Sequence, residues 1–257
     1  MKRYWCWWLH RYLLLIEEKD GKYIFEDFGD CRFEMTKEQL AARLVSQQCD
    51  ISSSDILYSS HLTSYDIKLI DEAIGQMPID NLFFDDSSTS NADNIMISIR
   101  NMKMKHDIDG AVIDYLQILN VNAPSKSFTR EQLMGDTARR LKNLAKELGI
   151  WIMALSQLNR SMSDPTPNLA RLRDSGQIAE AADMVMLVYR AEIYGRQFPE
   201  PFEHIPQDGT KGLAMIDVAK GRNVGTFKFL CNFDNKTTKF SDIEDNMNMA
   251  EEEEAPF

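Results

Sequence analysis

Short apolar segments alternate with amphipathic segments along most of this 257-residue chain, and this alternation restricts its fold more than any other feature. The apolar stretches in "NLFFDD", "GAVIDYLQIL" and "IWIMALSQ" are too short for helices and almost continuously hydrophobic. Strands of this kind are typical of parallel sheets that are covered by helices on both faces. We therefore predict an α/β fold with a mostly parallel twisted sheet, in which ligands lie at the carboxyl ends of the strands.

Capping patterns define the helices between these strands. Three segments place Thr three residues before Gln or Asp, which is a capping-box pattern; the pairs are Thr36 with Gln39, Thr63 with Asp66, and Thr129 with Gln132. The third helix is expected to end at Gly149. Further elements are expected as a helix at 91–106, a short helix between the polar loop with Pro165 and Pro167 and the strand "DMVMLVY", and strands in "YLLLIE", "KYIFE", "DMVMLVY", "GLAMIDVAK" and "GTFKFLCNF".

Charge and cysteine usage narrow the class of protein. The formal net charge is −11, but residues 242–257 hold 7 acidic residues and no Lys or Arg, which leaves 29 basic against 33 acidic residues elsewhere. We expect this acidic tail to be disordered, while the nearly balanced body neither requires nor excludes nucleic acid. The 4 cysteines are scattered without a CxxC pair, which favours reduced thiols in the cytoplasm. No apolar run is long enough for a membrane span.

Five sequence blocks appear in an order that resembles one family. They are "FEMTKEQLAARL", "VIDYLQIL", "AKELGIWIMALSQLNRS", "LARLRDSGQIAEAADMVMLVYR" and "IDVAKGRNVGT". The chain from Phe33 to about Ser241 is similar to the C-terminal motor domain of DnaB-type replicative helicases. The resemblance implies a RecA-like fold, ATP and Mg²⁺ as cofactors, single-stranded DNA as a partner, and a homo-hexamer or a mixed helicase ring without a membrane association.

The resemblance assigns nucleotide-site roles to five residues. Asp114 matches the carboxylate that holds Mg²⁺, Glu34 the glutamate that orients the attacking water, and Gln157 the residue that senses the γ-phosphate. Lys220 and Arg222 match a pair of cations that reach the neighbouring subunit's site, and strand alternation puts both on one face. Taken singly, each residue also has an ordinary structural explanation, such as a turn, a helix-terminal acid, a loop hydrogen bond or a solvated edge strand.

The "ARLRDSG" segment resembles the loop that contacts DNA in the central channel of this family. Arg173 and the backbone near Asp174 and Gly176 are expected to meet phosphates of one strand, because backbone N–H groups bind phosphate without reading sequence. Arg171 and Arg160 are further candidates for DNA binding, although for both an ordinary polar loop is an equally simple explanation.

The phosphate-binding motif G-x-x-x-x-G-K-[ST] of the family does not occur in the 257 residues. The only Gly-Lys pair is Gly21-Lys22, with Ile16 and Tyr23 where the motif needs Gly and Ser or Thr. We therefore expect residues 1–32 to be a divergent segment in place of that region, 33–241 a motor domain whose sheet is incomplete at its N-terminus, and 242–257 the tail. Three interpretations follow: an ATP-dependent helicase motor domain, an inactive RecA-like subunit that binds DNA or a helicase partner without hydrolysing ATP, or a RecA-like regulatory ATPase relative that is not connected with unwinding.

Overall fold

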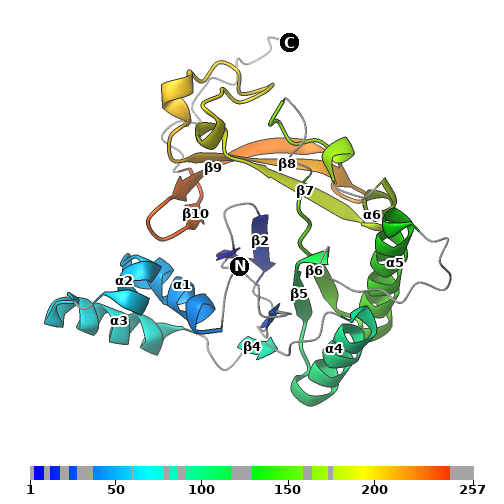
Figure 1. Cartoon of the computed structure of the whole chain (residues 1–257), viewed down its shortest axis with the longest axis horizontal. Helices are drawn as coiled ribbons and strands as arrows, with labels where there is room; N and C mark the ends of the chain where they lie inside the picture. The colour runs from blue at the N-terminus through cyan, green and yellow to red at the C-terminus, as the bar shows by residue number, and fades with distance from the viewer. Residues whose placement is uncertain are drawn as a thin grey trace, which may run out of the picture.

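A four-stranded parallel sheet forms the centre of the molecule. The computed structural model describes residues 3–8, 12–17, 23–27, 37–59, 61–77, 82–85, 91–116, 129–158, 164–172 and 176–243. The strand order is β4 (Leu82–Asp85), β3 (Tyr23–Asp27), β5 (Gly110–Asp114) and β6 (Trp151–Ala154), and all neighbours run parallel. The predicted parallel arrangement is confirmed for these strands (Figure 1).

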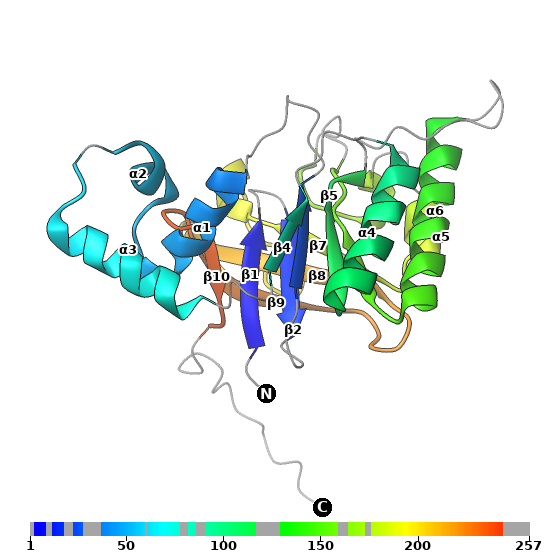
Figure 2. The same ribbon diagram turned by 90° about the horizontal axis from the view of Figure 1, so that it is seen from below.

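Helices lie on both sides of this sheet, as predicted for buried parallel strands. The helices α4 (Ala92–His106) and α5 (Arg130–Leu148) pack on one side, where Ile95, Ile99 and Leu144 join Ile113 of β5 in the main hydrophobic core. The helices α1 (Lys37–Cys49), α2 (Ser53–Tyr58) and α3 (Ser64–Gln76) lie on the opposite side (Figures 1 and 2). The buried strand β5 therefore has a covered environment, which explains its continuous apolar sequence.

Two of the predicted capping boxes are present. The Thr63 side chain accepts a hydrogen bond from the Asp66 amide, and the Asp66 carboxylate accepts one from the Thr63 amide at 2.8 Å. Thr129 and Gln132 make the same reciprocal pair at the start of α5. The helix α5 ends at Gly149, whose φ of 65° is the left-handed conformation that glycine adopts at helix ends. Thr36 lies outside the described residues.

The C-terminal strands form a second sheet that is antiparallel, in contrast to the parallel pairing of the first. Its order is β10 (Lys239–Ser241), β9 (Phe227–Asp234), β8 (Leu213–Gly221) and β7 (Met184–Tyr189). Parallel pairing needs a long crossover, but residues 222–226 make only a turn between β8 and β9. Residues 190–212 contain only the short 3₁₀ helices η4 (Ala191–Tyr194) and η5 (Gln207–Thr210). The short turn between β8 and β9 therefore produces antiparallel neighbours, whereas the connection between β7 and β8 is long and does not by its length decide their direction.

The N-terminal residues divide between two structures. The strands β1 (Arg3–Trp8) and β2 (Tyr12–Glu17) pair with each other antiparallel, which confirms the strand predicted in "YLLLIE". The strand predicted in "KYIFE" is β3, and it lies between β4 and β5 in the central sheet. Residues 23–27 therefore share the sheet of the motor region, so the proposed boundary at residue 32 does not coincide with an edge of this sheet. The acidic tail from residue 244 onward lies outside the described residues.

Within the described part of the chain, no helix is long and apolar enough to cross a membrane.

Candidate functional site

The carboxyl edge of the parallel sheet brings Asp114 and Gln157 onto neighbouring segments. Asp114 is the last residue of β5, and Gln157 follows the adjacent strand β6 by three residues. Backbone hydrogen bonds continue past the paired strands, from Leu155 N to Ile113 O at 2.9 Å and from Leu116 N to Leu155 O at 2.9 Å. The two side chains thus belong to one sheet edge, where the sequence predicted a ligand site.

A half-buried Asp114 at a strand end has the chemistry that Mg²⁺ requires. Magnesium takes one or two carboxylates, retains several waters and receives the remaining oxygens from substrate phosphates. Among the residues whose side chains are described, no group of three His, Cys, Asp or Glu side chains could hold a metal ion. A single carboxylate beside a phosphate fits magnesium and does not fit an all-protein metal cage. Glu34, the predicted water-orienting residue, lies outside the described residues.

The predicted DNA-contacting segment is connected to the Gln157 segment through the backbone. Leu158, next to Gln157, forms an antiparallel bridge with Leu172, which follows the 3₁₀ helix η3 (Leu169–Arg171). The helix α6 (Gly176–Ala181) begins shortly after this bridge, and Gly176 is its first residue. A shift at the end of β6 therefore has a direct backbone connection to the segment that leads into residues 173–175.

Arg171 is buried, which was not expected of a DNA-binding side chain. Only 6% of the residue is exposed, and its guanidinium donates a hydrogen bond to the Thr166 carbonyl at 3.0 Å. Its backbone amide donates to the Asn168 side chain at 3.1 Å. In this conformation Arg171 fixes the turn that precedes the predicted DNA-contacting loop. A direct contact with phosphate would require the Arg171 guanidinium to release the Thr166 carbonyl. Arg160, Arg173 and Asp174 lie outside the described residues.

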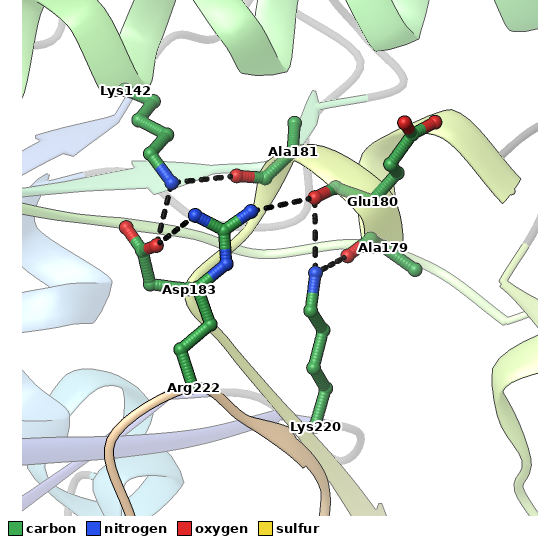
Figure 3. A network of polar contacts seen from close by, with 7 residues as sticks. All are labelled: Lys142, Ala179, Glu180, Ala181, Asp183, Lys220 and Arg222. Carbon is green, nitrogen blue, oxygen red and sulfur yellow. Dashed lines mark hydrogen bonds and ion pairs between the residues drawn. The ribbon is translucent and has the colours of Figure 1, made fainter.

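Lys220 and Arg222 both point to the carbonyl end of α6, so the structure brings the predicted cation pair together (Figure 3). The Lys220 ammonium donates to the Ala179 carbonyl at 2.6 Å and to the Glu180 carbonyl at 3.0 Å. The Arg222 guanidinium donates to the Glu180 carbonyl at 3.4 Å. No basic residue lies in the last turn of α6 itself, and these two cations complement the negative end of the helix dipole.

Asp183 connects Arg222 to α5, although no motif in the sequence had pointed to it. One carboxylate oxygen, Oδ1, receives both Lys142 Nζ of α5 at 2.5 Å and Arg222 Nη1 at 3.1 Å. The hydrogen bond from Lys142, supported by the charges of Lys142, Arg222 and Lys220, holds the pKa of Asp183 below its ordinary value. The signal available in the sequence was a lone acid at the start of the apolar stretch "DMVMLVY".

The helix α6 is also fixed along its length. A Cβ atom on Gly135 of α5 would lie 2.4 Å from Gln177 of α6, so this glycine permits the close approach of the two helices. The Lys142 ammonium donates to the Ala181 carbonyl at 3.3 Å. Ala179 of α6 packs against the buried cluster formed by Leu172 with Val185 and Leu187 of β7. The helix next to the predicted DNA loop is therefore held by α5, β7 and β8.

The chain is similar to known helicases over most of its length. The model of the DnaB-like helicase C terminal domain family matches residues 26–242. The replicative DNA helicase DnaB of Helicobacter pylori strain J99 is 32% identical over 252 residues, covering 87% of this chain and 51% of that protein. The DnaB of Geobacillus stearothermophilus is 31% identical over 216 residues, covering 82% of this chain and 44% of that protein.

Two solved structures share the fold, each with a TM-score of 0.71 and 24% identity over 88% of this chain. One is a DnaB-like replicative helicase studied with primase, of which 52% is covered, and the other is an ATPase domain, of which 75% is covered.

The predicted α/β RecA-like class is confirmed, and the chain belongs to the DnaB-like helicase C-terminal domain family. The family match begins at residue 26, inside the segment that we expected to be divergent. The chain spans about half the length of the curated relatives that it matches.

Proposed function

We propose that this chain is a motor subunit of a DnaB-type helicase ring, which uses ATP hydrolysis in the cytoplasm to move on single-stranded DNA and unwind duplex DNA during replication. The observation that supports this proposal best is the position of Lys220 and Arg222. Two cations with the spacing of the family motif converge on one helix end, and this helix directly follows the predicted DNA-contacting loop. Family membership supplies the class of reaction, and these contacts supply a path between nucleotide and DNA.

In the proposed site, Asp114 would hold Mg²⁺ beside the nucleotide phosphates, and the ion would supply positive charge opposite the transferring phosphoryl group. Glu34 orients and polarises the attacking water as general base. Gln157 contacts the γ-phosphate oxygen or this water through its amide, which can donate and accept hydrogen bonds. Loss of the γ-phosphate then changes the partners of Gln157, and the Leu158–Leu172 bridge conveys the change to the DNA loop.

Lys220 and Arg222 act on the nucleotide site of the neighbouring subunit in this proposal. Arg222 is suited to this role because 52% of its side chain is exposed. Like Lys220, it donates to the Glu180 carbonyl of α6 in this structure. Cations beside the γ-phosphate stabilise the charge that develops in the transition state. A ring, as a homo-hexamer or with complete DnaB-type subunits, is required because one subunit supplies these groups to the next.

The DNA contacts are assigned to Arg173 and to the backbone near Asp174 and Gly176, with Arg160 as a further cation. These groups bind phosphates of one strand and carry no sequence preference. Arg171 is assigned a supporting role, because its buried guanidinium fixes the turn at Thr166.

The proposal is tested by titrating this chain into a fixed amount of a complete DnaB-type subunit and measuring ATP turnover. The 257 residues contain no P-loop motif, so turnover in mixed rings reports the sites of the complete subunits. We expect mixed rings to retain activity with the parent chain and to lose more of it with Arg222→Ala, since each site that loses such a cation slows by roughly 10³-fold or more. Lys211→Ala, at an exposed position, is the control. Superimposable curves for Arg222→Ala and the parent chain would exclude a role of Arg222 in a neighbouring site.

A further inference from the structure

We propose that Asp183 is a positioning residue for Arg222, and that Asp183 with the carbonyl end of α6 forms a resting position for the cation pair. This inference rests on the proposed function of Lys220 and Arg222. In the resting position the pair stabilises α6, and a phosphate across the subunit boundary competes with α6 for the same two cations.

The contacts of the two cations define the resting position. Both side chains donate to the Glu180 carbonyl, and Lys220 also donates to the Ala179 carbonyl at 2.6 Å. These oxygens belong to the last turn of α6, where carbonyl groups have no partner within the helix. In the described contacts, neither cation is paired with a buried counter-ion. Lys220 bonds to backbone carbonyls, and the Asp183 and Arg222 side chains of the ion pair are 60% and 52% exposed. Both cations can therefore exchange a carbonyl for a phosphate oxygen without leaving a buried charge.

Asp183 directs Arg222 because it holds the guanidinium from the other side. Arg222 Nη1 lies 3.1 Å from Asp183 Oδ1 while Nη2 donates to Glu180, so the planar guanidinium is held between the two (Figure 3). A backbone hydrogen bond from Arg222 N to Asp183 O at 3.0 Å ties the same two residues together. Lys142 fixes the Asp183 carboxylate from α5 at 2.5 Å, so the carboxylate stays in place when the guanidinium moves.

The competition has a consequence for the DNA loop. Three cations and one carboxylate surround the end of α6 when the pair is at rest, and only Lys142 and Asp183 stay when the pair turns to a phosphate. The short helix α6 then loses the two cations from β8 at its negative end. Residues 173–175, which immediately precede α6, are thereby coupled to the nucleotide state of the neighbouring subunit, in addition to their own subunit through the Leu158–Leu172 bridge.

Hydrogen exchange of the α6 amides in the isolated 257-residue chain is the first test. We expect Lys220→Ala and Arg222→Ala each to accelerate exchange in the last turn of α6 by roughly two- to five-fold, the factor that corresponds to one charge at a helix terminus. Asp183→Asn should accelerate exchange less, because the loss of Arg222 from its position is partly offset by the removal of a negative charge from the negative end of the helix. Asp183→Glu keeps the charge and should return the rate toward that of the parent chain. Asp208→Asn and Lys211→Ala are charge-matched controls at exposed positions, with no change expected.

The second test adds ADP, Mg²⁺ and aluminium fluoride to rings of this chain with a complete DnaB-type subunit. This analogue of the transferring phosphoryl group should accelerate exchange of α6 in the parent chain and have little effect in Lys220→Ala with Arg222→Ala, where the cations are already absent.

If the three network variants exchange like the two controls, or if the analogue leaves α6 of the parent chain unchanged, the resting position does not exist as proposed. The measurement on the isolated chain needs neither a ring nor hydrolysis. It can therefore fail while the ATPase titration succeeds, and it can succeed while the titration fails.

Discussion

At the scale of single residues, a buried ion pair fixes the start of the long connection between β7 and β8. Arg190 lies over the Phe233 ring, 3.7 Å from its centroid, and donates hydrogen bonds to Glu192 and Asn235. Its side chain is 6% exposed and that of Glu192 is 15% exposed. The guanidinium thus combines charge pairing with a cation–π contact in a region that contains little regular structure.

Removing Arg190 should therefore be costly. Arg190→Ala leaves the Glu192 carboxylate without its guanidinium partner, and we expect the free energy of unfolding to fall by about 3 kcal/mol. Urea denaturation followed by circular dichroism measures this change. Arg196→Ala, six residues away on an exposed position, should stay within about 0.5 kcal/mol of the parent chain. A similar small change for both variants would show that the pair contributes little.

The same pair gives a defined dependence of stability on pH. Burial raises the pKa of Glu192, but hydrogen bonds from Arg190, the Gly212 amide and Asn235 outweigh this effect and hold the pKa below its ordinary value. A carboxylate with a lowered folded-state pKa stabilises the fold above its unfolded pKa, and this contribution disappears as the pH falls through the folded-state pKa. The stability difference between the parent chain and Glu192→Gln should thus be full at neutral pH and shrink below about pH 4.5. A difference that stays constant from pH 7 to pH 3 would contradict this assignment.

At the scale of elements, the short distance between α5 and α6 depends on Gly135, which has no side chain. A Cβ atom at Gly135 would lie 2.4 Å from both Cβ and Oε1 of Gln177, so an alanine forces the helices apart. Alanine favours a helix over glycine by about 1 kcal/mol, but overpacking costs about 1–3 kcal/mol. We expect Gly135→Ala to lower the melting temperature. Gly75→Ala in α3, where a Cβ atom meets nothing within 4 Å, should raise it. Stabilisation by both substitutions would show that α6 adapts freely.

Elements were predictable from the sequence where local chemistry alone determines them. The reciprocal caps at Thr63 and Thr129 were visible because the interacting groups are three residues apart. The antiparallel pairing of β7 to β10 was not, because the choice of partner strand decides it, and hydrophobic periodicity carries no information on strand direction. Asp183 escaped notice for the same reason. Its partners Lys142 and Arg222 lie about forty residues away on either side, and only the packing of α6 brings them together.

At the scale of the whole molecule, the parallel sheet carries Asp114, the proposed Mg²⁺ ligand, in a sequence that lacks the phosphate-binding loop motif. No G-x-x-x-x-G-K-[ST] sequence occurs in the 257 residues, so we expect the chain alone to bind ATP·Mg²⁺ weakly and to hydrolyse ATP at background rate. Isothermal titration calorimetry and a phosphate-release assay measure both properties. Steady turnover that Asp114→Asn abolishes would show that another segment takes over the function of the loop.

The carbonyl end of α1 is bound to the β9–β10 hairpin by side chains from the far end of the described chain. The Lys236 ammonium donates to the Asp50 carbonyl at 2.6 Å across 186 residues, and that of Lys239 donates to the Gln47 carbonyl at 3.1 Å across 192 residues. During synthesis, the carbonyl end of α1 therefore stays open to water until the β9–β10 hairpin has left the ribosome. Contacts of such long sequence separation slow folding and prolong the exposure of incomplete surfaces. The helix that is made first among those described is thus completed among the last, and a nascent chain stopped before residue 236 carries α1 without these partners.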